Sequence, residues 1–186
     1  MSILSWYANK LSTHPRVTKS VTAATIGAAG DQVQQAFERL DDPAQRNDLA
    51  RTTRMAAFGG LFVGPFLHWW YGRLEALFPA NVPLRTVKKV ALDQATAAPL
   101  TTLGFFAIMG LISGHPPDRI AARIQDRFVD TMLVNYAVWP IAIAVNFAVV
   151  PVRYQVLWTN TVGLAYNTFL SQQQHAHQKP QAAGEE

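Results

Sequence analysis

Residues Val90 to Ser113 read VALDQATAAPLTTLGFFAIMGLIS, and this stretch indicates how the chain folds. Its length suits a helix across a hydrocarbon core of ~30 Å, which takes ~20 mainly apolar residues. The polar interruptions are three threonines and the pair Asp93-Gln94. A carboxylate at the centre of a membrane helix costs roughly 2.5–3.5 kcal/mol, so Asp93 is expected to face protein, water or a solute and not lipid.

Three further segments have a similar length. Met55–Gly72 is apolar except for His68, and Met132–Val152 contains two asparagines and no charge. Val17–Phe37 is the most polar, because it contains Asp31 and three glutamines, and it needs partner helices to satisfy them. We therefore expect an all-α integral membrane bundle of four transmembrane helices with short amphipathic interfacial helices.

The composition agrees with this interpretation. Hydrophobic residues make up 49% of the chain and charged residues 15%, whereas soluble domains carry ~25% charged residues. The net charge is +4, but most lysines and arginines flank the apolar segments, where their side chains reach phosphate headgroups. A basic stripe with interleaved aromatics is lacking, so direct nucleic-acid binding is not expected. The absence of cysteine excludes disulfides and thiolate metal sites.

We expect a single membrane-embedded helical domain over residues 1–171 and a polar, disordered tail over residues 172–186. No internal repeat is evident. The N-terminal sequence lacks the basic region and apolar core of a secretory signal peptide, so insertion is expected to rely on internal segments.

Turn signals separate the expected helices. His14-Pro15 is expected to end a short N-terminal helix, and Asp41-Asp42-Pro43 to begin a new one. Phe78 to Pro83 and Gly114 to Pro117 predict two further turns. After the second of these, an amphipathic surface helix with Ile120, Ile124 and Phe128 on its apolar face is expected before the last span.

Helical spacing places small and polar residues on common faces of the expected spans. Gly64 and His68 lie one turn apart, and prolines 65, 99 and 140 each free a backbone carbonyl. Such groups can line a solute path in a bundle interior. The candidate channel-lining residues are Asp31, Gln35, Gly64, His68, Asp93, Gln94, Asn135 and Asn146.

A structural interpretation of the same residues stays open. The two acids can form ion pairs, with Lys89 one turn before Asp93 and with Arg54 or Lys19 as further partners. The glycines can be packing contacts, His68 can be an interfacial or core histidine, and the asparagines can form interhelical hydrogen bonds.

The order and spacing of these residues resemble the Mpv-17 / peroxisomal membrane protein 22 kDa family across nearly the whole chain. In the N-terminal half the similar positions are Gly30-Asp31, Gln35, Arg51, Arg54, Gly59, Gly64-Pro65, His68, Trp70-Tyr71, Lys89, Asp93-Gln94 and Pro99. In the C-terminal half they are Asn135-Tyr136, Trp139-Pro140, Asn146-Phe147, Val150-Pro151, Arg153, Asn167 and Leu170-Ser171. The chain departs from the family pattern at Ile143, where glutamine is usual, and at Tyr166 and Phe169, where tryptophan and tyrosine are usual.

The resemblance implies a four-span protein of the mitochondrial inner membrane or of the peroxisomal membrane. It implies a channel for small solutes or metabolites with a role in mitochondrial metabolism, and an indirect role in mitochondrial DNA maintenance. The alternative is a noncatalytic scaffold or assembly subunit. Because the C-terminal Gly-Glu-Glu is no peroxisomal address, the mitochondrial membrane is the first expectation. Expected partners are the lipid bilayer and small metabolites or ions, and a homo-oligomer is left open.

No enzymatic activity is expected. An intramembrane aspartyl protease would use two acids on two helices. Ala28-Ala29-Gly30-Asp31 lacks the first glycine of the usual Gly-x-Gly-Asp, and Leu92 precedes Asp93 where such enzymes have tyrosine. No zinc, serine-nucleophile or phosphate-loop pattern is present, so no catalytic residue, cofactor or metal is expected.

Overall fold

A computed structural model describes residues 2–166 of the chain, and helices dominate this part of it. In chain order the elements are α1 (Ile3–Thr13), α2 (Pro15–Asp41), α3 (Leu49–Ala57), the π-helix η1 (Phe58–Val63), α4 (Gly64–Leu77), α5 (Arg85–Leu92), the π-helix η2 (Asp93–Ala97), α6 (Ala98–Ile112), α7 (Pro117–Val149) and the 3₁₀-helix η3 (Val152–Tyr154). Residues 155–166 are also helical. The expected tail over residues 172–186 and the similar positions Asn167, Leu170 and Ser171 lie outside the described residues.

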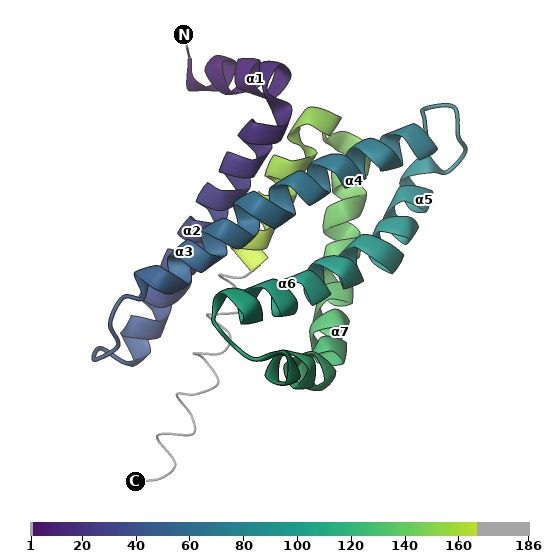
Figure 1. The fold of residues 1–186 in the computed structure, drawn as a ribbon. Helices are drawn as coiled ribbons and strands as arrows, with labels where there is room; N and C mark the ends of the chain where they lie inside the picture. The colour runs from purple at the N-terminus through teal and green to yellow at the C-terminus, as the bar shows by residue number, and fades with distance from the viewer. Residues whose placement is uncertain (1, 167–186) are drawn as a thin grey trace.

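Four long helical passes run between two ends of the molecule (Figure 1). They are α2, the continuous helix of residues 49–77, the continuous helix of residues 85–112, and α7. Two of them, Arg85–Ile112 and Pro117–Val149, are long and apolar enough to cross a membrane. Only 22% of the most apolar window of each is buried inside the protein, so most of its surface is free to contact lipid. The all-α prediction is confirmed, whereas the count of four spans stays a prediction.

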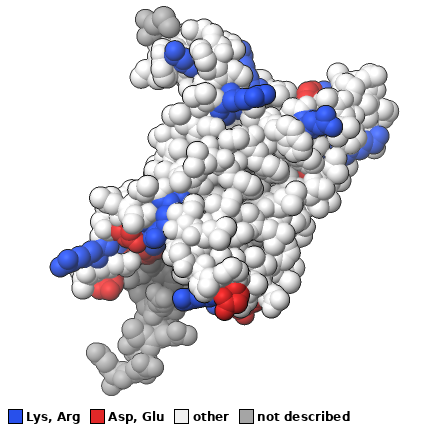
Figure 2. All heavy atoms as spheres, viewed as in Figure 1, with Lys and Arg blue, Asp and Glu red and all other residues white. Residues whose placement is uncertain are grey.

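Charge is distributed as a membrane protein requires. On the face shown in Figure 2, lysine, arginine, aspartate and glutamate gather toward the ends of the molecule, and the surface between them is uncharged. Large apolar side chains such as Leu61, Leu100 and Ile141 are exposed along the helices. In water these residues would form an aggregation-prone surface, whereas in a bilayer they contact acyl chains.

The turn predictions are largely confirmed. α1 ends at Thr13 and α2 begins at Pro15, and Phe78–Pro83 lies outside the helices. The structure corrects the prediction for Asp41-Asp42-Pro43, because the next helix begins only at Leu49. Its N-cap is Asp48, whose side chain accepts a hydrogen bond from the backbone N–H of Arg51. The cap satisfies an otherwise unpaired N–H, and this local chemistry sets the start of α3.

The separate surface helix expected before the last span is also corrected. The structure has a single helix, α7, from Pro117 to Val149. No glycine or proline between Asp118 and Trp139 interrupts it. Its first turn packs on α6, since Ile120 is buried and a Cβ added at Gly110 would lie 2.6 Å from its Cγ1 atom.

The two π-helices occupy equivalent places in two similar helices. Each comes just before a proline, and the hydrogen bond there spans five residues, from Gly64 N–H to Gly59 O and from Ala98 N–H to Asp93 O. Arg51-Thr52 precedes Pro65 by the same interval as Arg85-Thr86 precedes Pro99. Residues 49–77 and 85–112 therefore share the order α-helix, π-helix, proline and α-helix, and a short turn joins them, a similarity that the sequence analysis missed.

The core cluster joins α4, α7 and the helix of residues 155–166. Its buried members are Leu67, Tyr71, Leu74, Ile143, Phe147 and Val156. The rings of Tyr71 and Phe147 meet edge to face with centroids 5.3 Å apart. Ile143 therefore contributes to apolar packing at the position where the resembling family has glutamine. This packing holds α4 against α7 and fixes the polar groups beside it.

Candidate functional site

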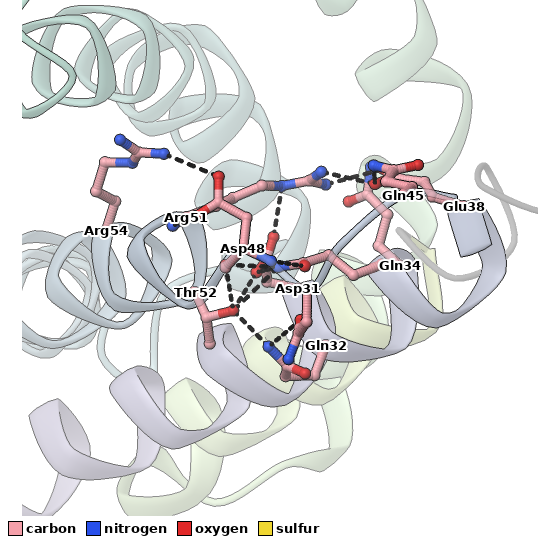
Figure 3. Close-up of polar contacts among 11 residues, drawn as sticks. Asp31, Gln32, Gln34, Glu38, Gln45, Asp48, Arg51, Thr52 and Arg54 are labelled. Carbon is pink, nitrogen blue, oxygen red and sulfur yellow. Dashed lines mark hydrogen bonds and ion pairs between the residues drawn. The ribbon is translucent and has the colours of Figure 1, made fainter. Parts of the chain in front are cut away.

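Asp31 is the centre of a polar network between α2 and α3 (Figure 3). The residue is 2% exposed. Thr52 Oγ1 and Gln35 Nε2 each donate a hydrogen bond of 2.6 Å to its Oδ2 atom. Arg51 Nε lies 2.7 Å from Oδ1. The carboxylate thus replaces its hydration by a hydroxyl, an amide and a guanidinium, which makes its burial tolerable.

Arg51 also binds a second carboxylate, that of Glu38. Its two terminal nitrogens donate to the two Glu38 oxygens at 2.8 and 3.0 Å, the bidentate arrangement favoured by guanidinium. Glu38 lies outside the expected span Val17–Phe37. Burial raises the pKa of Glu38, but the hydrogen bonds and charge of Arg51, with help from Gln34 and Gln45, outweigh burial and hold the pKa below its ordinary value of 4.5.

The loop between α2 and α3 is held by the same network. Gln35 accepts a hydrogen bond of 2.7 Å from the backbone N–H of Asp48 and donates one of 2.9 Å to the Asp48 carbonyl. Asp31 and Gln35 lie one turn apart on α2, and Asp48 and Thr52 lie one turn apart at the start of α3. The hydrogen bonds among these four residues therefore hold one turn of α2 against the first turn of α3.

Arg54 was expected as a charge partner of the acids, and the structure corrects this expectation for Asp31. Its Nη2 atom lies 3.5 Å from Asp48 Oδ2, and Arg51 is the partner of Asp31. The register of the antiparallel crossing explains this. A Cβ added at Gly27 would lie 3.0 Å from the carbonyl oxygen of Met55, so the turn that contains Arg54 faces α2 one turn away from Asp31.

Asp93 forms a second, separate site, at the start of η2. It is 4% exposed. Trp70 Nε1 donates to its Oδ1 atom at 2.9 Å, and Gln94 Nε2 donates to Oδ2 at 3.1 Å. The backbone carbonyl of Gln94 accepts a hydrogen bond from Tyr136 of α7. Asp93 is therefore held by neutral donors.

Lys89 does not pair with Asp93, contrary to expectation. It is buried and forms an ion pair with Glu75 of α4, and its Nζ atom lies 5.9 Å from the centroid of the Phe147 ring. The antiparallel hairpin of α4 and α5 places Lys89 opposite Glu75, and Asp93, one turn further, opposite Trp70.

The predicted asparagines form interhelical hydrogen bonds from α7. Asn135 Nδ2 donates to Thr102 Oγ1 at 3.2 Å, and Asn146 Nδ2 donates to Thr159 Oγ1 at 3.3 Å. Thr159 also bonds Tyr71 Oη at 2.9 Å. Thr159 was missed by the sequence analysis, although its position one turn after Gln155 places two polar groups on one helix face.

Gly64 and His68 lie at the contact of α4 with α2. A Cβ added at Gly64 would lie 2.7 Å from Ser20 Cα, so this glycine is a packing residue, as one of the two interpretations proposed. His68 Nδ1 lies 3.1 Å from the buried Lys19 Nζ. Lys19, considered as a partner of the acids, thus contacts a histidine instead.

The eight candidate residues do not converge on one point. Asp31 with Gln35, Asp93 with Gln94, and Gly64 with His68 belong to three separate contacts, and Asn135 and Asn146 take part in two more. Asp31 and Asp93 share no hydrogen bond within residues 2–166, and each has its own donors. This arrangement argues against a carboxyl pair that shares a proton, as an aspartyl protease would need.

Comparisons with known proteins match this chain over most of its length. The sequence profile of the Mpv17 / PMP22 family matches residues 110–171. Protein sym1 of Aspergillus oryzae is 34% identical over 89% of this chain and 94% of its own length. This chain belongs to the Mpv17/PMP22 family.

Other members of the Mpv17/PMP22 family match at similar levels. The mitochondrial inner membrane protein Mpv17 of Mus musculus is 30% identical over 94% of this chain and 99% of its own length. Peroxisomal membrane protein 2 of Bos taurus is 30% identical over 90% and 87%. No solved structure matches. The resemblance seen in the sequence is confirmed, and this member of the family is a membrane protein with helices apolar enough to span the bilayer.

Proposed function

We propose that this member of the Mpv17/PMP22 family is a small channel that passes small solutes or metabolites across an organelle membrane. The mitochondrial inner membrane is the first location proposed and the peroxisomal membrane the alternative, because relatives are named for each. In mitochondria such a channel would serve metabolism and homeostasis, and would affect mitochondrial DNA maintenance only indirectly.

One observation carries the proposal: polar groups are buried inside a bundle whose exterior is apolar. Lys89, Asp93, Asn146 and Gln155 are all buried. They come from α5, η2, α7 and the helix of residues 155–166. In a bilayer, ionisable groups inside a bundle are costly, and they commonly mark a path for ions or solutes.

The proposed topology has four spans: residues 17–37 of α2, residues 49–77, residues 85–112, and α7. α2 contributes Asp31 and Gln35, which bond one another and also Asp48 and Thr52 at the start of α3. A polar helix of this kind inserts as part of a bundle and not alone. The charged turns at both ends of the passes then lie in the two aqueous phases (Figure 2).

The described conformation corresponds to a closed channel in this proposal. Asp93 is covered by Trp70, Gln94 and their helices, so a solute would reach it only after the helices separate. The π-helices η1 and η2 offer a place for such movement, because a π segment followed by proline has fewer regular hydrogen bonds to break.

Reconstitution of the purified full-length protein tests the proposal. Planar bilayers and liposomes are compared for the wild type, Asp93→Asn and Asp130→Asn, whose parent residue is exposed on α7. A channel lined by Asp93 predicts conductance whose selectivity changes in Asp93→Asn and stays unchanged in Asp130→Asn. Silent bilayers and liposomes impermeable to a broad set of metabolites would contradict the channel. Recovery of one stoichiometric crosslinked complex by such a silent protein would support the scaffold alternative.

A further inference from the structure

Two adjoining cavities lie at the end of the bundle that includes the α2–α3 loop and the α6–α7 turn (Figure 1). One, of about 800 Å³, is lined mainly by α6 and the first part of α7. The other, of about 350 Å³, lies between α2, α3 and α6. Both are lined by Phe105, Phe106 and Arg123, so they are neighbouring compartments around one aromatic pair. Their volumes suit small molecules.

Guanidinium groups dominate the charged lining. Arg51, Arg54 and Arg123 line the smaller cavity, and none of the described residues that line it is acidic. Arg119, Arg123 and Arg127 line the larger one, together with His115 and the acid Asp126.

Two of the arginines that line the smaller cavity form ion pairs with carboxylates that do not line it. Asp31 and Glu38 bind Arg51, and Asp48 contacts Arg54. These ion pairs fix the position of the guanidinium groups and leave other N–H donors available. Gln34 and Ser113 add neutral donors to the same wall.

Arg123 differs from these two arginines. Among the described residues it has neither an ion pair nor a hydrogen bond, and it is exposed at the junction of both cavities. Arg119, one turn earlier on α7, is likewise exposed and without an ion pair in residues 2–166. Two unpaired cations beside aromatic walls attract an anion that can accept several hydrogen bonds.

We infer that these joined cavities, here called the arginine vestibule and centred on Phe105, Phe106 and Arg123, bind small free oxyanions that carry carboxylate or phosphate groups. The inference rests on the proposed channel, since it assigns the solute class that enters at this end. A phosphate group of a lipid offers the same chemistry, and the experiment separates the two sources.

The first test measures binding and requires no conduction. The full-length protein in phosphatidylcholine nanodiscs is titrated with citrate and with inorganic phosphate by calorimetry. We expect Arg123→Gln to weaken citrate binding by about threefold to tenfold, as expected for one exposed charged hydrogen-bonding group. Arg123→Glu should abolish it. The control Lys88→Gln removes the same charge from the opposite end of the bundle and should change binding by less than about twofold.

Three results would overturn the vestibule. The first is a wild-type protein that binds neither citrate nor phosphate. The second is a Lys88→Gln protein whose citrate binding is weakened as much as that of Arg123→Gln. The third is a protein that binds phosphatidylglycerol in the nanodisc but does not bind citrate. The last would identify a lipid site. Arg119→Gln provides a second variant if Arg123 variants are not recovered folded.

A flux assay in the same lipid separates this inference from the channel proposal. If citrate binds through Arg123 but no solute crosses, the vestibule stands and the channel proposal falls. If solutes cross while the citrate-to-glucose permeability ratio is the same in the wild type and in Arg123→Glu, the vestibule falls and the channel stands.

Discussion

Asp31 on α2 and Arg51 on α3 form an ion pair, with Oδ1 and Nε 2.7 Å apart, at the point where the two helices cross. The aspartate is buried, while the arginine is partly exposed and reaches onward to Glu38. The pair therefore links a buried acid to a charged end of the bundle. The burial of Asp31 depends on its ion pair with Arg51, whereas Arg51 is partly exposed to solvent and also binds Glu38.

Arg51→Gln should destabilise the protein by about 1–3 kcal/mol. Removal of one member of a buried pair leaves an uncompensated charge and costs ~3–5 kcal/mol, and the partial exposure of Arg51 reduces this. Thermal unfolding in mild detergent measures the change. Arg54→Gln is the control, since its contact with the exposed Asp48 is 3.5 Å long and should be worth less than about 1 kcal/mol. Equal losses in the two variants would contradict the assigned partner.

The Glu38–Arg51 bond predicts a loss of stability in acid. Because the pKa of Glu38 is lowered on folding, its stabilising contribution is present above the ordinary value of 4.5 and is lost as the pH falls through the lower folded pKa. Thermal midpoints measured from neutral pH to below pH ~4 should therefore fall more for the wild type than for Glu38→Gln. A variant whose acid profile is parallel to that of the wild type would show that this bond does not contribute.

The sequence was sufficient to predict the helical passes and most of their ends. Proline and glycine act locally, so the breaks at His14-Pro15 and at Gly114 to Pro117 could be recognised without tertiary information. Asp48 was not recognised as the N-cap of α3, because Asp42-Pro43 offered a competing local signal. The continuity of α7 was missed because its charged first half has an amphipathic pattern that also suits a surface helix.

Charge partners were harder to predict than helices. The choice of Arg51 over Arg54 depends on the register of the crossing between α2 and α3, which no single helix determines. Lys89 was assigned to Asp93 by spacing along one helix, whereas the facing helix supplies Glu75. Spacing identifies side chains on one face, but it does not say which groups of a neighbouring helix lie opposite.

The Lys89–Glu75 pair predicts strong coupling between two helices. Lys89→Met should destabilise less in a Glu75→Gln background than in the wild type, because the single change leaves Glu75 with only its longer contact to Arg85 among the described residues. A double-mutant cycle on thermal stability should give an interaction energy of about 1–3 kcal/mol. Arg85 also contacts Glu75, at 3.5 Å, so Arg85→Gln serves as the comparison and should show a smaller coupling. Additive effects of Lys89→Met and Glu75→Gln would refute the pairing.

Gly64 and Gly72, both on α4, should respond in opposite directions to alanine. At Gly64 the new Cβ would lie 2.7 Å from Ser20 Cα and 3.1 Å from the Lys19 carbonyl oxygen, so α2 and α4 must separate. Overpacking of this kind costs typically ~1–3 kcal/mol.

At Gly72 nothing lies within 4 Å of the added Cβ, and alanine in a helix interior is more stable than glycine by roughly 0.5–1 kcal/mol. Thermal midpoints in detergent should thus fall for Gly64→Ala and rise slightly for Gly72→Ala. Because Gly64 packs beside Lys19, the first change should also weaken the Lys19–His68 contact, which a shift of the His68 ring resonances would report. A Gly64→Ala protein as stable as the wild type would mean that α2 and α4 do not pack this closely.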